Sequence, residues 1–245
     1  RVMSTGELMA TELGAAYLRT QGLDVRWADA RRLLRADERE GASAKARALS
    51  ATCEFAPDDA LARELASASR IAITQGFIAS DGEGHTVLLG RGGSDTSAAY
   101  FAAKLRAQRL EIWTDVPGMF SANPRMTPAA RLLKALHYDE AQEIATSGAK
   151  VLHPRCILPV RQYGIPLSVH DTHHPDLVGT VISAQAAGGP QVKPLVKAIV
   201  LSDDFRAVGA SAGSAAAGLV GRKTTRPEQL GRLVAEIPLA MLISQ

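Results

Sequence analysis

Residues 86–108 read TVLLGRGGSDTSAAYFAAKLRAQ, and this stretch sets the expectation for the fold. An apolar strand, Thr86–Leu89, leads directly into a glycine-rich turn, Gly90–Asp95, and a helix with an apolar stripe is predicted over 96–108. Backbone N–H groups point outward where such a helix begins, and the helix dipole favours negative charge there. The stretch therefore predicts an α/β unit with a cradle for an anion.

The cradle does not have the spacing of a P-loop or of a dinucleotide-binding fingerprint. An ordinary tight turn, in which Ser94 or Asp95 caps the helix, is the structural alternative. Arg91 favours the functional interpretation, because an arginine within a glycine turn can hold a carboxylate or a phosphate with its planar fork.

Strands alternate with helices on both sides of this stretch, which is typical of a mostly parallel sheet with helices on both faces. The predicted strands lie at 23–27, 71–74, 110–113 and 166–169, and the predicted helices at 4–20, 58–69, 128–137, 139–147 and 150–162. Residues 184–194 (AQAAGGPQVKP) predict a linker. Beyond it, short strands at 197–200, 218–221 and 239–243 and a helix at 226–236 predict a small α+β region over 195–245.

Composition excludes several classes of protein. The 245 residues carry 28 Lys+Arg against 25 Asp+Glu, a net charge of +3 that is too small and scattered to indicate a nucleic-acid partner. No apolar run approaches the ~18 residues that a membrane span needs, and no secretory signal is recognisable at the start. Cys53 and Cys156 are predicted to be buried thiols in a reducing compartment, so we expect a cytoplasmic protein. No metal site is expected, and His173–His174 is predicted to be a surface pair without an acidic partner.

Four further motifs have both a functional and a structural interpretation. Thr114–Gly118 follows a strand, where open α/β sheets bind ligands, but it also fits a turn. Arg125 and Lys150 could meet phosphates or be solvated. Ser4–Glu7 fits a capping box, and a ligand role for Glu7 is equally open.

Taken together, these motifs resemble the aspartate kinase branch of the amino-acid kinase family. The matching strings are Ser4–Glu7, ITQGFI (73–78), LGRGGSD (89–95), WTDVPG (113–118) with NPR (123–125), and GAKVLHP (148–154). The resemblance covers about residues 1–183 as an amino-acid kinase domain. It implies a three-layer sandwich around a mostly parallel central sheet.

The resemblance implies phosphorylation of the side-chain carboxylate of L-aspartate by ATP with Mg²⁺, giving 4-phospho-L-aspartate for lysine, methionine and threonine synthesis. Arg91, Ser94 and the Gly92–Gly93 amides would hold the aspartate carboxylates, Glu7 its ammonium group, and Phe77 would line the pocket. Asp95 would organise the reactive centre, with Arg91 and Lys150 also catalytic. The residues implied for ATP are Thr114, Asp115, Phe120, Arg125, Lys150 and Val151.

The sequence also departs from the family pattern. Members begin with a strand carrying Lys-x-Gly-Gly-[Ser/Thr], whose lysine contacts the transferring phosphate, and an early threonine contacts aspartate; neither is found here. Phe120 stands where the family often has tyrosine. Another amino-acid kinase with a different anionic acceptor, and a non-catalytic amino-acid sensor that kept the fold, are the alternative functions.

The tail resembles pieces of the ACT regulatory modules that follow aspartate kinase domains, in Gly218–Lys223 and Leu242–Gln245. Such modules pair between subunits and bind an end-product amino acid. The resemblance therefore implies a homodimer or larger assembly, inhibited by lysine rather than threonine. Some relatives also fuse the kinase to a second pathway enzyme.

Overall fold

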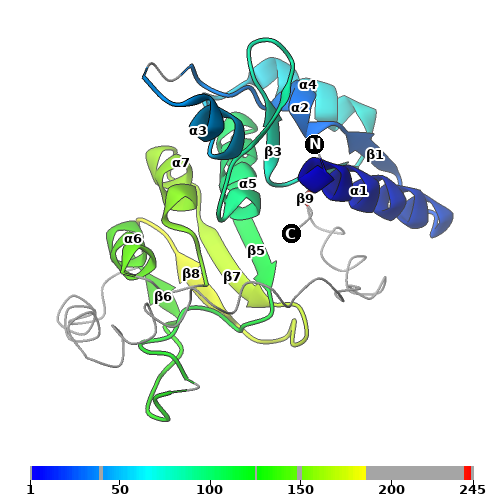
Figure 1. The fold of residues 1–245 in the computed structure, drawn as a ribbon. Helices are drawn as coiled ribbons and strands as arrows, with labels where there is room; N and C mark the ends of the chain where they lie inside the picture. Colours follow the sequence, from blue (N-terminus) through cyan, green and yellow to red (C-terminus); the bar gives the residue numbers. More distant parts are fainter. Residues whose placement is uncertain (1, 39–40, 125, 148–150, 186–239, 244–245) are drawn as a thin grey trace. The chain divides into compact units, whose positions relative to one another are not determined.

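The structure, a computed structural model, describes residues 2–38, 41–124, 126–147, 151–185 and 240–243 (Figure 1). They belong to two compact units, which we call the first unit (Arg1–Ala107 with Arg226–Gln245) and the second unit (Gln108–Thr225). The first unit contains α1 (Val2–Thr20), β1 (Val25–Ala28), α2 (Ala30–Leu33), α3 (Ala44–Leu49), α4 (Asp59–Ala68), β2 (Ile71–Thr74), β3 (Ile78–Ser80), β4 (Thr86–Leu88), α5 (Gly93–Lys104) and β9 (Ala240–Ile243). The second contains β5 (Leu110–Thr114), β6 (Ala135–Leu136), α6 (Tyr138–Thr146), a 3₁₀ turn (Pro154–Cys156), α7 (Ile157–Gln162), β7 (Leu167–Asp171) and β8 (Thr180–Ile182).

Helices cover both faces of a parallel sheet in the first unit. Its order among the described strands is β1-β2-β9. Since side chains alternate along a strand, β2 presents Ile71 and Ile73 to α1, where they pack with Ala15 and Leu18. The opposite face packs on α4 through a cluster of Ala28, Leu61, Leu65 and Ala72. This gives a helix–sheet–helix sandwich around β2, all four of whose residues are buried.

A second core of the first unit forms around the β3–β4 hairpin and α5. The strands are antiparallel, with Ile78 opposite Leu88. Both pack with Phe101 and Tyr100 of α5, which is buried along most of its length. This core fixes where α5 begins, because the chain passes from β4 into the helix through only four residues, 89–92.

The second unit is built on the sheet β5-β7-β8-β6. The β5–β7 and β6–β8 pairs are parallel and the β7–β8 pair is antiparallel. The helices α6 and α7 pack against one another (Figure 1). The buried hydroxyl of Tyr138 at the start of α6 donates to the carbonyl of Ile165 at 2.6 Å, and burial raises the pKa of this phenol.

The predicted α/β class with a mostly parallel sheet is confirmed, and the strands and helices of residues 2–114 lie close to their predicted positions. The helix predicted over 128–137 is wrong. There the backbone pairs with the segment after Gly118 instead: Ser121 N donates to Arg131 O at 2.9 Å and Leu133 N to Met119 O at 2.8 Å. Long-range pairing thus overrides the local helical pattern.

The helix predicted over 150–162 is shorter than expected. Proline disfavours helical backbone in the residue before it, and the first turn begins at Pro154, with His153 Nδ1 accepting from Arg155 N at 3.3 Å. The strands β3 and β8 were not predicted. No helix among the described residues is both long and apolar enough to cross a membrane.

Of the strands and the helix predicted over residues 195–245, only the last strand lies within the described residues. Residues 186–239, which hold most of the predicted linker and the strands and helix expected before 239, lie outside the described residues. The strand predicted at 239–243 is observed as β9. It pairs in parallel with β2 of the first unit, from Ile71 opposite Ala240 to Thr74 opposite Ile243.

Candidate anion and nucleotide site

The glycine turn leaves the N-terminus of α5 open. Gly90 and Gly92 have φ values of 78° and 64°, a region that glycine adopts without strain. Gly92 is the N-cap, and no side chain caps the helix. Ser94 and Asp95 lie inside the first turn, so the expectation that one of them is the N-cap is wrong. The backbone N–H groups of this turn are directed to where an anion would bind.

Phe77 forms a wall of this turn and has an unusual backbone. Its φ is 70°, which is costly for a side chain of this size, typically about 1–3 kcal/mol. Two hydrogen bonds hold it: Phe77 N donates to Ser97 Oγ at 3.2 Å, and Leu89 N donates to Phe77 O at 2.9 Å. A Cβ on Gly93 would lie 2.6 Å from Phe77 Cδ2, so only glycine fits there. The structure thus brings Phe77 and Gly93 together.

Arg91 is exposed at the tip of the turn. Within the described part of the chain it makes no hydrogen bond and no ion pair, so its fork is available to a ligand. Ser94 and Asp95 are half-buried beside it on the first turn of α5. Residues 91–95 therefore lie together at the start of α5, as their positions in the sequence predicted.

Glu7 is held on α1 by a buried polar network. Thr11 Oγ1 donates to Glu7 O at 2.8 Å and accepts from Gln75 Nε2 at 2.7 Å and Trp27 Nε1 at 3.1 Å. Gln75 Oε1 in turn accepts from Ala30 N at 2.8 Å. The network ties α1 to the end of β2 and to the start of α2. Because α1 already includes Val2, Ser4 is not its N-cap, and the capping-box alternative is wrong.

Two buried polar residues at the end of β2, Thr74 and Gln75, were not predicted as site residues from the sequence. Gln75 is fully buried and joins three elements, and Thr74 Oγ1 is buried without a hydrogen bond to the described residues. A polar pair directly after the apolar string Ile71–Ile73 was the available signal. Since a buried polar atom costs free energy unless it is satisfied, Thr74 is an added candidate for contact with a ligand.

The second unit places the predicted nucleotide residues at the carboxyl end of β5. Thr114 lies opposite Asp171 of β7, and its carbonyl accepts from Thr172 N at 2.8 Å and Thr172 Oγ1 at 2.9 Å. Asp115 is exposed next to it. Phe120 is half-buried and bridges to Leu132. Half-buried Val151 is also described, whereas Arg125 and Lys150 lie outside the described residues.

An ion pair lies at the same strand ends. Asp171 Oδ2 contacts His174 Nδ1 at 2.9 Å, and Asp171 Oδ1 accepts from His173 N at 2.8 Å. Burial opposes the charged form of Asp171, but these hydrogen bonds and the histidine charges outweigh it and lower the pKa of the carboxyl below its ordinary value. Both histidines are exposed, which confirms the predicted surface pair, and Asp171 is an acidic partner of His174 that the argument from metal-ligand spacing did not include.

Among the described residues, no group of three or more His, Cys, Asp or Glu side chains is arranged to hold a metal ion. Cys53 and Cys156 are buried and form no disulfide. A metal bound to nucleotide phosphates would need few protein ligands, since Mg²⁺ in kinases keeps water and phosphate oxygens around it.

Comparison with known proteins agrees with this geometry. The sequence model of the amino acid kinase family matches residues 1–171. The chain belongs to the amino acid kinase family. Over 201 residues it is 38% identical to the lysine-sensitive aspartokinase 3 of Escherichia coli K12. Over 117 residues it is 50% identical to a bifunctional aspartokinase/homoserine dehydrogenase of Buchnera aphidicola, covering 48% of this chain and 14% of that protein.

Solved structures of this family agree. The crystal structure of E. coli aspartokinase III in complex with aspartate and ADP superposes with a TM-score of 0.64 at 38% identity, over 74% of this chain and 39% of that one. An aspartate kinase from Synechocystis gives a TM-score of 0.59 at 34% identity, over 75% of this chain and 29% of that one. The 201-residue match covers 79% of this chain and 42% of the E. coli aspartokinase, so the chain spans less than half of that relative's length.

Proposed function

We propose that this chain is the kinase part of an aspartate kinase, which transfers the γ-phosphoryl group of ATP to the side-chain carboxylate of L-aspartate and yields 4-phospho-L-aspartate. The observation that carries the proposal is the uncapped start of α5 with Arg91 and Ser94 beside it. A relative with 38% identity is named as a complex with aspartate and ADP.

The chemistry required matches these groups. A carboxylate is already ionised at pH 7, so no general base has to activate it. The difficulty lies in bringing two anions together and in stabilising charge on the transferring phosphoryl group. In the proposal, Arg91, Ser94 and the Gly92–Gly93 amides hold the carboxylates of aspartate. Glu7 takes its ammonium group, and Asp95 organises the reactive centre.

ATP would be held by residues of the second unit. Thr114 and Asp115 stand at the carboxyl end of β5, where parallel sheets bind ligands. Arg125 and Lys150 would neutralise phosphate charge, and Phe120 and Val151 would contact the nucleotide. Mg²⁺, held with the nucleotide rather than by a protein cluster of the described residues, would supply Lewis-acid stabilisation of the transferring phosphoryl group.

The decisive experiment traps the acyl phosphate. The natural polypeptide that carries residues 1–245 is incubated with ATP and Mg²⁺. With L-aspartate or N-acetylglutamate as acceptor, hydroxylamine is added and hydroxamate and ADP are measured; with UMP as acceptor, ADP and UDP are measured. We expect hydroxamate and ADP only with L-aspartate. Turnover of N-acetylglutamate or UMP without aspartate would identify a different amino-acid kinase, and absence of turnover with all three would favour a sensor.

Regulation belongs to the same proposal. A structure of the E. coli relative is named as its T-state complex with lysine and aspartate, and it superposes with a TM-score of 0.61 at 38% identity. We propose that the natural protein is a homodimer or larger assembly in the cytoplasm, inhibited by lysine, with residues 195–239 as part of an ACT-type regulatory region before the chain returns to the first unit at β9. The kinase domain would cover residues 1–183, joined by the linker 184–194.

A further inference from the structure

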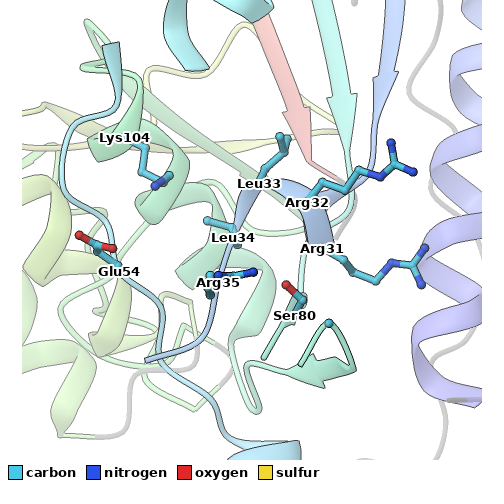
Figure 2. A pocket seen from close by; sticks show the side chains of 9 residues that line it. Arg31, Arg32, Leu33, Leu34, Arg35, Glu54, Ser80 and Lys104 are labelled. Carbon is cyan, nitrogen blue, oxygen red and sulfur yellow. The ribbon is translucent and has the colours of Figure 1, made fainter. Parts of the chain in front are cut away.

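The first unit contains a cationic cavity that has no role in the proposed reaction. Its volume is about 470 Å³, within the range of small-molecule sites. Four cations line it, Arg31, Arg32, Arg35 and Lys104, against the single carboxylate of Glu54 (Figure 2). The arginines come from α2 and the residues after it, whereas Lys104 is the last residue of α5.

Among the described residues, most of these cations have no ion-pair partner. Arg31 is the exception, because its guanidinium contacts Asp29 Oδ2 at 2.6 Å and Asp29 Oδ1 at 2.9 Å. Within the described ranges, Arg32, Arg35 and Lys104 make no ion pair and no side-chain hydrogen bond. Glu54 makes none either, although it lines the same cavity. Three cations and one carboxylate thus line the cavity, with the charged ends of Arg32 and Lys104 on opposite sides of it in Figure 2.

The cavity wall is fixed by the backbone. Ser80 N donates to Leu34 O at 3.1 Å, and Ala36 N donates to Ser80 O at 2.7 Å, so the segment around Arg35 is bonded to β3. Leu34 is buried in the core behind it. The arginines are therefore presented from a rigid backbone, which lowers the entropy that a bound ligand must remove.

From this arrangement we propose that the cavity binds a small anion with two or more acidic groups, of the phosphate or carboxylate class. Guanidinium forks pair with both kinds of oxyanion through two parallel hydrogen bonds, and Lys104 adds a point charge from a second element. The site is separate from the candidate aspartate site, because Lys104 ends the 12-residue helix that the glycine turn begins. A helix of that length spans about 18 Å.

Binding is tested by titration calorimetry on the natural polypeptide that carries residues 1–245, with inorganic pyrophosphate in one arm and citrate in the other, which separates phosphate from carboxylate recognition. We expect saturable binding of one probe or both. Arg35→Glu should weaken it at least tenfold, and Glu54→Gln should tighten it about threefold because the repelling carboxylate is removed. Arg63→Glu is the matched control: it makes the same charge change on exposed α4, outside the cavity, and should alter affinity less than twofold.

Three results would overturn the proposal: no saturable binding of either probe, equal weakening by Arg35→Glu and Arg63→Glu, or complete displacement of the probes by saturating ADP, which would place them at the nucleotide site. Circular dichroism and thermal melting check folding of each variant. Should Arg35→Glu not fold, the double change Arg32→Gln and Arg35→Gln, which removes charge without reversing it, gives the same readout.

Discussion

Arg91 lies at the tip of a turn whose glycines hold it outward, with no protein partner among the described residues. In the proposed role its planar fork makes two parallel hydrogen bonds to a substrate carboxylate, which a lysine ammonium cannot reproduce. We therefore expect Arg91→Lys to lower kcat/KM for aspartate by about 30- to 1000-fold, equivalent to about 2–4 kcal/mol of transition-state stabilisation. Steady-state kinetics at varied aspartate measures this loss, and values within threefold of the parent would show that Arg91 does not bind substrate.

A substitution at Gly93 gives a second single-residue test of the proposed aspartate site. Its replacement by alanine would place a methyl group 2.6 Å from Phe77 Cδ2 and 3.1 Å from Phe77 Cα, so the strained Phe77 backbone would have to move. We expect Gly93→Ala to raise the KM for aspartate at least tenfold. Gly82→Ala is the control, because a Cβ there meets only Glu38 Oε1 at 3.8 Å and its backbone is ordinary. Equal kinetics for the two variants would argue against a substrate wall at Phe77.

Residue by residue, the sequence predicted the parts of the site that are local in the chain. Arg91 to Asp95 are consecutive in the glycine turn and the start of α5, so their proximity follows from the sequence, whereas their roles rest on the family resemblance. The Thr11–Gln75 bond and the Asp171–His174 pair were not predicted, the first because it joins residues 64 positions apart. Such contacts depend on how α1, β2 and α2 pack, which no local pattern contains.

At the scale of elements, α1 contains a glycine, Gly14, at a position that needs neither a positive φ nor a close approach of another atom. A Cβ on Gly14 would meet no atom within 4 Å, and Gly14 lies in the helix interior with ordinary backbone. Glycine there loses more backbone entropy on folding than alanine does. We expect Gly14→Ala to raise the free energy of unfolding by about 0.5–1 kcal/mol in urea denaturation, with kinetic constants unchanged. A loss of stability would mean that α1 is packed differently.

The end of β7 makes stability depend on pH. Folding lowers the pKa of Asp171, so the unfolded chain takes up this proton first as the pH falls. The stabilisation is complete above the ordinary pKa of an aspartate, about 3.9, and is lost progressively as the pH falls from there through the lower pKa of the folded state. We expect Asp171→Asn to lower Tm by about 2–4 °C at pH 7, with a smaller difference at pH 3. Melting curves across that range measure this difference, and one that grows toward low pH would contradict the assignment.

Long elements were predicted better than short ones. α1, α4 and α5 have 19, 10 and 12 residues and lie close to where they were expected, whereas β3 and β8 have three residues each, too few for a period to be recognised. The helix predicted over 128–137 fails for the opposite reason. Its residues are apolar enough to form a helix, but their backbone forms hydrogen bonds with Met119 and Ser121 instead.

For the whole molecule, the regulatory proposal gives one prediction. An effector that binds one of two states shifts the equilibrium by its difference in affinity, typically about 1–3 kcal/mol. We expect millimolar lysine to inhibit the natural polypeptide at least fivefold and threonine to have little effect, with light scattering showing a dimer or larger species. A monomer whose rate ignores both amino acids would contradict it.

The parallel pairing of β9 with β2 has a consequence for synthesis on the ribosome. β2 is translated well before β9, at about 5–20 residues per second, so the β9-facing edge of β2 has no partner until Ala240–Ile243 have left the exit tunnel. During that interval the nascent chain exposes unpaired N–H and C=O groups on a strand of Ile, Ala, Ile and Thr, the kind of edge that recruits other chains. The first unit therefore reaches its final form only after Ala240–Ile243 have been synthesised and have emerged, and its yield should depend on chaperones that shield β2 in the meantime.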